Sequence, residues 1–369
     1  MPGSSGAVDL NISDDDFSAC RNLIKGGSKS FYAASLLLPE AVRLPSYALY
    51  AFCRVADDVV DDVQANQAVL DRLRLRLDRV YQGVPDDHPA DRAFARVIET
   101  FAIPKALPLA LLEGFEWDLG GRTYETIEEV RAYAARVAGT VGVMMTLIMG
   151  RRDPMTLARS CDLGVAMQLT NIARDVGEDA RAGRVYLPEV WLASNGLSRQ
   201  SLIERPEPSA SLSKVVAHLL DEAETLYNRA NPGVGQLPRA CRPAIQAARL
   251  IYREIGREVA RRGFDSVSDR AVVSMHRKQV LAAYAYASSY VSAQDSKVPA
   301  LPETRFLIES IHHQVEFARI LPKDYIYMHR RNQERRPFGL FDMDKIIEIM
   351  TEMELRDRQT KSSKLSIQR

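Results

Sequence analysis

The sequence predicts an all-α fold. Apolar residues recur at helical spacing along most of the 369-residue chain, and segments with the alternating pattern of strands are scarce. Stretches rich in proline and glycine separate the helical segments from one another. Hydrophobic residues make up 46% of the chain and charged residues 26%, which is the balance of a soluble globular protein.

The breaks between apolar segments define the expected helices in order along the chain. Loops are indicated by Gly, Pro and Asp clusters at 83–87 and 150–154, by the polar stretch 204–211, and by Asn-Pro-Gly at 231–233. The helices expected between these breaks cover residues 16–27, 40–64, 66–82, 90–102, 106–119, 127–150, 154–181, 211–230, 239–262 and 268–292.

The helix at 154–181 has the clearest ends. Asp153 is a good N-cap, Pro154 suits the first helical position, and Gly183 is a plausible stop. Residues 137–149 form the longest nearly apolar run, which is too short to span a bilayer and indicates a buried core helix. Any membrane contact is therefore expected to be peripheral.

Three regions are expected along the chain. Residues 1–15 form a flexible N-terminus, residues 16–292 a helical core, and residues 293–369 an extension with a short helix at 343–355 and a disordered tail. The N-terminus lacks the basic start and apolar core of a signal peptide. Four widely spaced cysteines without a CxxC pair favour a reducing cytoplasm, and a formal net charge of +1 gives no reason to expect nucleic-acid binding.

The first acidic cluster contains Asp57, Asp58, Asp61 and Asp62, near the end of the helix expected at 40–64. Carboxylates four residues apart stack on one helix face, and at about 5.5 Å one such pair costs on the order of 3 kcal/mol. Either Asp57 with Asp61 or Asp58 with Asp62 would be the main ligands of a cation. Arg54, one turn earlier, either holds a diphosphate oxygen or pairs with a neighbouring aspartate. A solvated run of surface charge is the simpler alternative.

The second acidic cluster lies on the helix expected at 154–181. Gln168, Asn171, Asp175 and Asp179 recur at spacings of three, four and four, so they form one polar stripe. Apolar residues cover the other faces of this helix, which predicts that the stripe faces inward or lines a cavity. An exposed stripe on a surface helix is the alternative.

Repulsion within both clusters indicates a compensating cation, and hard divalent ions prefer oxygen ligands. Mg²⁺ usually keeps several waters and is shared between one or two carboxylates and substrate phosphates. The two clusters therefore predict a diphosphate-handling site that uses Mg²⁺, with Mn²⁺ as the alternative ion.

These motifs together resemble the squalene/phytoene synthase family of head-to-head prenyl transferases. The resemblance rests on SKSFY at 28–32, YAFCRVADDVVD at 50–61, VAGTVG at 137–142, QLTNIARDVGED at 168–179 and GRVYLP at 183–188, with a fainter segment at 247–255. The matching segments span about residues 20–290. The segments at 36–39 and 183–188 are most similar to bacterial phytoene synthases, especially those of photosynthetic proteobacteria.

The resemblance implies the isoprenoid-synthase fold, a single all-α domain around a central cavity, and it assigns roles to residues of this chain. The implied metal ligands are Asp57, Asp61, Asn171, Asp175 and Asp179. The four aspartates of this set, with Tyr133 and Gln168, are the implied catalytic residues. The implied substrate-binding residues are Ser28, Ser30, Phe31, Tyr50, Arg54, Arg174, Arg184, Tyr186, Tyr252 and Arg270. The apolar lining is expected to include Phe31, Leu36, Met144, Met145, Ile148 and Met149.

The implied reaction is the condensation of two geranylgeranyl diphosphates, through a cyclopropyl diphosphate, to phytoene in carotenoid biosynthesis. Squalene or dehydrosqualene formation from farnesyl diphosphate stays open. NADPH is not expected, since no GxGxxG segment is present, although a helical enzyme need not use that motif. The apolar product is expected to pass to a membrane through a peripheral surface near 320–356, and downstream carotenoid enzymes are candidate partners.

Three other functions fit the sequence less well. A head-to-tail prenyl elongase usually carries DDxxD in both places, whereas the second cluster here reads RDVGED. A terpene cyclase has a second motif with wider spacing. A non-catalytic helical assembly factor would have no reason to keep repelling carboxylates.

Overall fold

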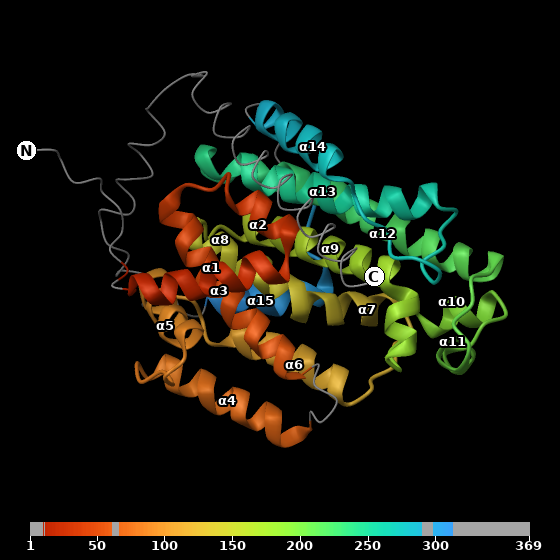
Figure 1. Cartoon of the computed structure of the whole chain (residues 1–369), viewed down its shortest axis with the longest axis horizontal. Coiled ribbons are helices and arrows are strands. Elements are labelled where there is room, and N and C mark those ends of the chain that lie inside the picture. Colours follow the sequence, from red (N-terminus) through yellow and green to blue (C-terminus); the bar gives the residue numbers. More distant parts are fainter. Residues whose placement is uncertain (1–9, 11, 61–65, 290–297, 313–369) are drawn as a thin grey trace, which may run out of the picture.

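The computed structural model describes residues 10, 12–60, 66–289 and 298–312 (Figure 1). Within these residues every regular element is a helix and no strand occurs, so the predicted all-α class is confirmed. The first six helices are α1 (Asp14–Gly27), α2 (Lys29–Ser35), α3 (Glu40–Val60), α4 (Gln67–Tyr81), α5 (Pro89–Phe101) and α6 (Ala106–Leu119). Of these, only α2 was not predicted.

The helix predicted at 127–150 is divided by a π-helical turn. The segment consists of α7 (Ile127–Ala134), the π-helix η1 (Ala135–Gly139) and α8 (Thr140–Ile148). A π-turn shifts the side chains that come after it around the helix axis, and such turns are frequent at functional sites. α7 and α8 consequently present differently aligned faces to the centre of the molecule.

The long helix α9 (Pro154–Arg181) has the predicted ends. The Asp153 side chain accepts a hydrogen bond from the Thr156 amide at 2.9 Å, and Pro154 occupies the first turn. After the helix ends, Gly183 adopts a φ of +77°, a conformation that side chains other than glycine disfavour. α9 packs along η1, α8, α12 and α13, and therefore forms the centre of the fold.

The C-terminal half contains two short helices that the sequence did not predict, followed by three long ones. These elements are α10 (Glu189–Ser194), α11 (Arg199–Glu204), α12 (Ala210–Val234), the 3₁₀ turn η2 (Arg239–Cys241), α13 (Arg242–Arg261) and α14 (Met275–Ser288). In Figure 1, α4 and α14 lie at opposite edges of the molecule, with α8, α9 and α15 between them.

The predicted break at 231–233 is wrong, because α12 continues through Pro232 to Val234. At this point α12 crosses α9 very closely, since a Cβ added to Gly233 would lie 2.2 Å from the Cβ of Arg159. Packing against α9 therefore holds the last turn in helical form, although proline and glycine both weaken a helix locally.

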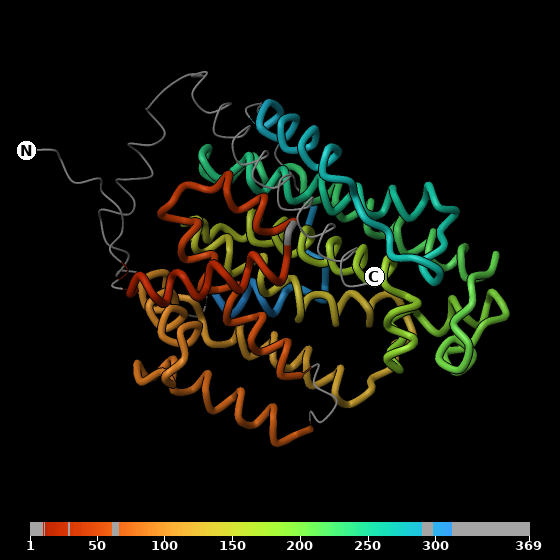
Figure 2. The backbone as a smooth tube through the Cα atoms, viewed as in Figure 1, coloured from red at the N-terminus to blue at the C-terminus, as the bar shows by residue number. Residues whose placement is uncertain are grey.

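The packed core extends beyond the predicted boundary at residue 292. After η3 (Pro302–Thr304), helix α15 (Arg305–His312) contacts α6, α8 and α9, and its backbone lies among the central helices in Figure 2. Leu307 and Ile311 of this helix are buried. The remainder of the predicted extension, including the helix expected at 343–355, lies outside the described residues, as does most of the segment 1–15. No helix in the described part of the chain combines the length and the hydrophobicity needed to cross a bilayer.

Candidate functional site

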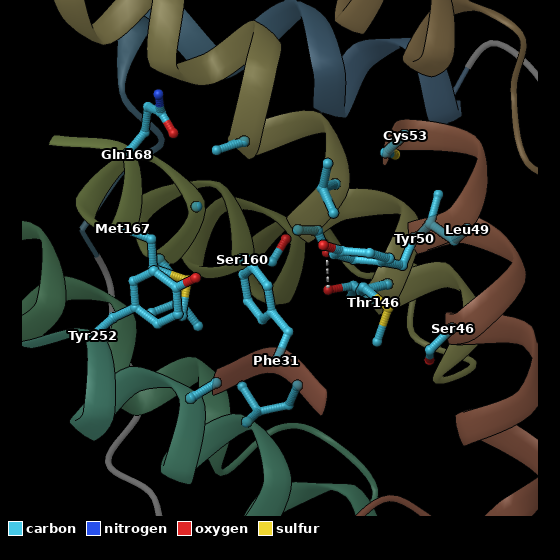
Figure 3. Close-up of a pocket in the computed structure, with 18 of the residues that line it drawn as sticks. Phe31, Ser46, Leu49, Tyr50, Cys53, Thr146, Ser160, Met167, Gln168 and Tyr252 are labelled. Atoms are coloured by element: carbon cyan, nitrogen blue, oxygen red, sulfur yellow. Dashed lines mark hydrogen bonds between the residues drawn. The ribbon is translucent and has the colours of Figure 1, made fainter. Parts of the chain in front are cut away.

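A cavity of about 400 Å³ lies at the centre of the helices. Its walls come from α1, α2, α3, α6, α7, η1, α8, α9, α12 and α13, and most of the lining is apolar. Figure 3 shows Phe31, Tyr50, Met167 and Tyr252 arranged around this space from four different helices. A volume in this range is typical of pockets for small organic ligands.

The cavity has an apolar depth and a polar end. On α9 the lining runs from Thr156 to Asn171, which spans roughly 22 Å at the rise of an α-helix. Asn171 and Gln168 lie near the acidic cluster of α9, and Arg54 and Asp57 of α3 line the same cavity. The predicted site residues that line the cavity are Phe31, Tyr50, Arg54, Asp57, Tyr133, Gln168, Asn171 and Tyr252.

The apolar lining agrees with the prediction in part. Phe31, Met145 and Met149 line the cavity, whereas Met144 and Ile148 are buried without being part of its lining. Met145 and Met149 are four residues apart and share one face of the segment, while Met144 and Ile148 lie on another face. Leu36 packs against the hydrophobic core and is also outside the lining.

An aromatic wall connects α2, α3 and α13. The ring of Phe31 lies 5.0 Å from that of Tyr252 and 6.4 Å from that of Tyr50, measured between ring centroids. Ser28 caps α2 by accepting a hydrogen bond from the Phe31 amide at 3.2 Å, which orients this helix. Burial raises the pKa of Tyr252 to about 12, so its hydroxyl is neutral and available as a hydrogen-bond donor.

The first acidic cluster occupies the C-terminal turn of α3. Arg54 donates a hydrogen bond to Asp57 at 3.3 Å and forms an ion pair with Asp58. Both carboxylates are partly open to solvent, and the Asp57 side chain is 41% exposed. Asp61, the other predicted ligand in this cluster, lies outside the described residues.

The second acidic cluster is more enclosed. The Asp175 side chain is only 13% exposed, and it accepts hydrogen bonds from Arg174 Nε at 2.7 Å and from Arg270 Nε at 2.8 Å. Burial raises the pKa of Asp179 to about 7, and the charges of Asp175 and Glu178 act in the same direction. The positive charge of Arg184 acts to lower the pKa of Asp179, so Arg184 lies close enough to interact with the Asp179 carboxylate.

A loop between α13 and α14 is packed directly onto the second cluster. The Gly177 amide donates to the Ser266 carbonyl at 2.9 Å, and Arg181 donates to the Val267 carbonyl at 2.8 Å. A Cβ at position 177 would lie 2.7 Å from the Cα of Val267, so only glycine allows this approach. The same loop carries Arg270, which explains how a residue 95 positions away from Asp175 reaches it.

Asp118 of α6 also lines the cavity, and the sequence analysis did not identify it. It accepts a hydrogen bond from the Tyr133 hydroxyl at 2.8 Å and another from the Tyr186 hydroxyl at 2.7 Å. Asp118 belongs to neither acidic cluster, and its two partners are 15 and 68 residues distant, so no local spacing indicated this group.

The remaining predicted residues stand apart from the cavity. Ser30 belongs to α2 but is not part of the cavity lining in the described structure. Arg174, Arg184 and Arg270 surround the second acidic cluster instead of the apolar depth. Tyr186 is also outside the lining and donates a hydrogen bond to Asp118.

The donor set fits a magnesium ion that is completed by substrate. Among the described residues, no three aspartate, glutamate, histidine or cysteine side chains converge as a ready-made metal site. Asp57, Asp175 and Asp179 nevertheless offer carboxylate oxygens near the polar end of the cavity, and Asn171 offers an amide oxygen. One or two carboxylates together with phosphate oxygens are the usual ligands of Mg²⁺ in proteins.

Comparisons with known proteins agree with this geometry. Residues 24–279 match the family model described as squalene/phytoene synthase. The chain is 53% identical over 279 residues to the phytoene synthase of Cereibacter sphaeroides, covering 73% of this chain and 79% of that protein. It is 47% identical to the phytoene synthase of Rhodobacter capsulatus over 82% of this chain and 92% of that one.

A solved structure supports the same assignment. The crystal structure of a dehydrosqualene synthase in complex with ligand matches with a TM-score of 0.69 at 34% identity, over 75% of this chain and 98% of that one. The predicted isoprenoid-synthase fold is therefore confirmed. The chain belongs to the squalene/phytoene synthase family.

Proposed function

We propose that this protein condenses two molecules of geranylgeranyl diphosphate head to head and forms phytoene. The observation that carries the proposal is the cavity, which has an apolar depth and ends beside two acidic clusters and their arginines. Such a cavity suits a long hydrocarbon chain with a diphosphate at one end. The identity of 53% to a phytoene synthase supports the choice of product.

Arginines and tyrosines at the polar end are proposed to bind diphosphate. Arg54, Arg174, Arg184 and Arg270 present guanidinium groups that suit phosphate oxygens. Arg270 and Arg174 are each paired with Asp175 through two nitrogens, and the guanidinium groups have further N–H donors for phosphate oxygens. The other proposed substrate contacts are Ser28, Ser30, Phe31, Tyr50, Tyr186 and Tyr252.

A divalent ion fits the carboxylates of this end. Asp57, Asp61, Asn171, Asp175 and Asp179 would hold Mg²⁺, or Mn²⁺ as the alternative. When bound, the ion supplies positive charge that stabilises the departing diphosphate. The protein contributes the same stabilisation through its arginines, which are oriented before the substrate arrives.

The cavity protects the cations that ionisation produces. Loss of diphosphate from the first substrate leaves an allylic cation, and the double bond of the second substrate attacks it to give a new carbocation. Loss of a proton from this carbocation closes the three-membered ring of a cyclopropyl diphosphate. A second ionisation rearranges the carbon skeleton, and loss of a proton completes the product. The apolar lining excludes water from these cations, while Tyr133 and Gln168, which belong to this lining, are proposed to contact the reacting carbons.

Product analysis tests the proposal. The purified protein is incubated with geranylgeranyl diphosphate or farnesyl diphosphate, with and without NADPH, and the products are identified by mass. We expect phytoene from geranylgeranyl diphosphate, unchanged by NADPH and dependent on Mg²⁺. Consumption of isopentenyl diphosphate, or no hydrocarbon product from either substrate, would contradict the proposal.

The second candidate is squalene or dehydrosqualene formation from farnesyl diphosphate. It is favoured by the structural match to a dehydrosqualene synthase. A thirty-carbon product formed faster than the forty-carbon one would select it, and a mass increase in the presence of NADPH would select squalene.

We further propose that the protein acts in the cytoplasm and contacts a membrane peripherally to deliver its apolar product, with downstream carotenoid enzymes as partners. The surface predicted for this contact, near 320–356, lies outside the described residues. Sedimentation with liposomes compares the full chain with a variant shortened after residue 312. Equal partitioning of the two would contradict a role for that surface.

A further inference from the structure

We propose that Asp118, which lines the cavity, is a positioning residue that holds the hydroxyls of Tyr133 and Tyr186 in one orientation. The inference rests on the proposed function, which it deepens by adding a residue that belongs to neither acidic cluster. Asp118 acts through the two tyrosines, and these shape the electrostatic surroundings of the carbocations formed in the cavity.

Hydrogen-bond chemistry determines the orientation of both hydroxyls. An ionised carboxylate only accepts hydrogen bonds, so the Tyr133 and Tyr186 hydroxyls must both donate to Asp118. The donor–acceptor distances of 2.8 and 2.7 Å, one to each carboxylate oxygen, are those of well-formed hydrogen bonds. With their protons directed to Asp118, both hydroxyls present only oxygen lone pairs to any other neighbour.

Packing restricts the orientation of the Tyr133 and Tyr186 rings, in addition to the restriction that Asp118 places on their hydroxyls. The rings of Tyr133 and Tyr186 stack at 4.9 Å with an interplanar angle of 22°. Tyr124 is buried behind them, with its ring 5.5 Å from that of Tyr133 and 6.0 Å from that of Tyr186. Separate helical and loop segments therefore meet at one carboxylate, and the tyrosines have little room to turn.

The placement of this group connects it to the reaction. Asp118 and Tyr133 both line the cavity, and the Asp118 charge reaches Asp179 of the second cluster. A tyrosine that presents its ring and oxygen lone pairs stabilises a nearby cation, whereas a tyrosine that turns its O–H outward would repel the cation. Asp118 thus keeps the tyrosine pair in the state that favours carbocation chemistry over loss of intermediate.

The decisive test is a mutant cycle on the full chain. Asp118→Asn keeps the size of the side chain but replaces one acceptor oxygen with a donor, so one tyrosine loses its partner. We expect kcat to fall about 100-fold with KM changed less than about threefold, as for removal of one oriented group. We also expect more cyclopropyl diphosphate relative to final product.

The double and triple variants separate positioning from a general structural effect. If Asp118 acts through the hydroxyls, adding Asp118→Asn to the Tyr133→Phe, Tyr186→Phe double variant causes no further loss of kcat. The proposal would be overturned if adding Asp118→Asn to the double variant lowered kcat by the same factor as it does in the wild-type protein. It would also be overturned if Asp118→Asn alone kept the wild-type kcat and product ratio. Should Asp118→Asn fail to fold, the two tyrosine variants and their combination still test it, because full additivity between them contradicts a shared partner.

Glu116→Gln is the matched control, since Glu116 lies on the same helix but pairs with Arg74 on the outside of the fold, at 2.6 Å. It should leave kcat and the product ratio unchanged. The proposed function is tested independently of the Asp118 proposal, and it is contradicted if the wild-type protein forms no phytoene. The mutant cycle would then be run on whichever prenyl diphosphate the wild-type protein converts.

Discussion

The two acidic clusters differ in how their charge is accommodated. At the end of α3, the Asp57 side chain is 41% exposed and pairs with Arg54 of its own helix. In the middle of the site, the Asp175 side chain is 13% exposed and is held by Arg174 and by Arg270 from a distant loop. At the first cluster, solvent screens part of the carboxylate charge. At the second cluster, arginine side chains of the protein provide most of the compensation.

This difference teaches that similar sequence motifs need not behave alike. Solvent weakens the repulsion at the first cluster, so losing one charge there changes little in the absence of substrate. At the second cluster, protons and arginines compete for the same carboxylates, and the proposed divalent ion would join this competition. We therefore expect the second cluster to respond to pH and to mutation of its arginines, and the first to respond mainly to substrate.

The largest effect is expected from removing the carboxylates that we propose to bind the metal. Asp57→Ala, Asp175→Ala and Asp179→Ala should each lower kcat/KM by at least about 1000-fold, because the leaving group loses its counter-charge. The measurement is steady-state hydrocarbon formation in Mg²⁺. Glu99→Ala on the outer face of α5, where Glu99 is 75% exposed, is the control. Near-normal activity in any two of the three variants would refute the two-cluster site.

A pH effect should come from the second cluster alone. Burial raises the pKa of Asp179 to about 7, so the carboxyl group gains a proton as the pH falls through 7 and can no longer bind a cation. We expect apparent Mg²⁺ affinity to fall about fivefold between pH 7 and pH 6, as the ionised fraction of Asp179 falls. Titration of activity with Mg²⁺ at several pH values measures this. An equal pH dependence in Asp179→Asn would show that another group is responsible.

Asp179 should also affect the stability of the metal-free protein. Here a rise in pH is unfavourable, because it lowers the free energy of unfolding, whereas it favours Mg²⁺ binding. Between pH 4 and 7 the folded state holds a proton on Asp179 that the unfolded state has released, so the free energy of unfolding falls as pH rises. We expect Asp179→Asn to unfold at higher denaturant concentration at pH 8, by about 2 kcal/mol, with no difference below pH 4. Chemical denaturation without Mg²⁺ tests this, and a pH-independent difference would contradict it.

The smallest effect is expected at Arg270, whose side chain is 53% exposed. Arg270→Gln removes a competitor of the metal at Asp175, so the substrate-free protein should bind Mn²⁺ about threefold more tightly. The KM for prenyl diphosphate should rise, since a phosphate contact is lost. Calorimetric titration with Mn²⁺ measures the first change, and weaker metal binding would argue that Arg270 supports the metal site.

Much of the helical framework could be predicted from the sequence, because long amphipathic segments with clear caps form helices in almost any context. The ends of α9 illustrate this, since Asp153 and Pro154 act within one turn. The continuation of α12 through Pro232 could not be predicted, because it depends on close packing against Arg159 of α9. The π-turn in η1 likewise had no sign in the apolar pattern around it.

In the site, too, residues that share a helix face could be predicted from their spacing, whereas a residue whose role depends on distant partners could not. Helical periodicity placed Gln168 and Asn171 on one face, and the structure brings both to the cavity. Asp118 could not be found in this way, since it is a single acid on an ordinary helix. Its importance arises from Tyr133 and Tyr186, which only the folded chain brings to it.

The central cavity is lined mostly by apolar side chains, which an apolar ligand can contact from several sides. A long hydrocarbon makes these contacts, and its transfer from the cavity into water is unfavourable. Once both diphosphates have left, the finished hydrocarbon has no favourable aqueous way out. We therefore expect turnover to depend on an apolar acceptor phase, and the rate of product release to depend on the properties of that phase as well as on those of the enzyme.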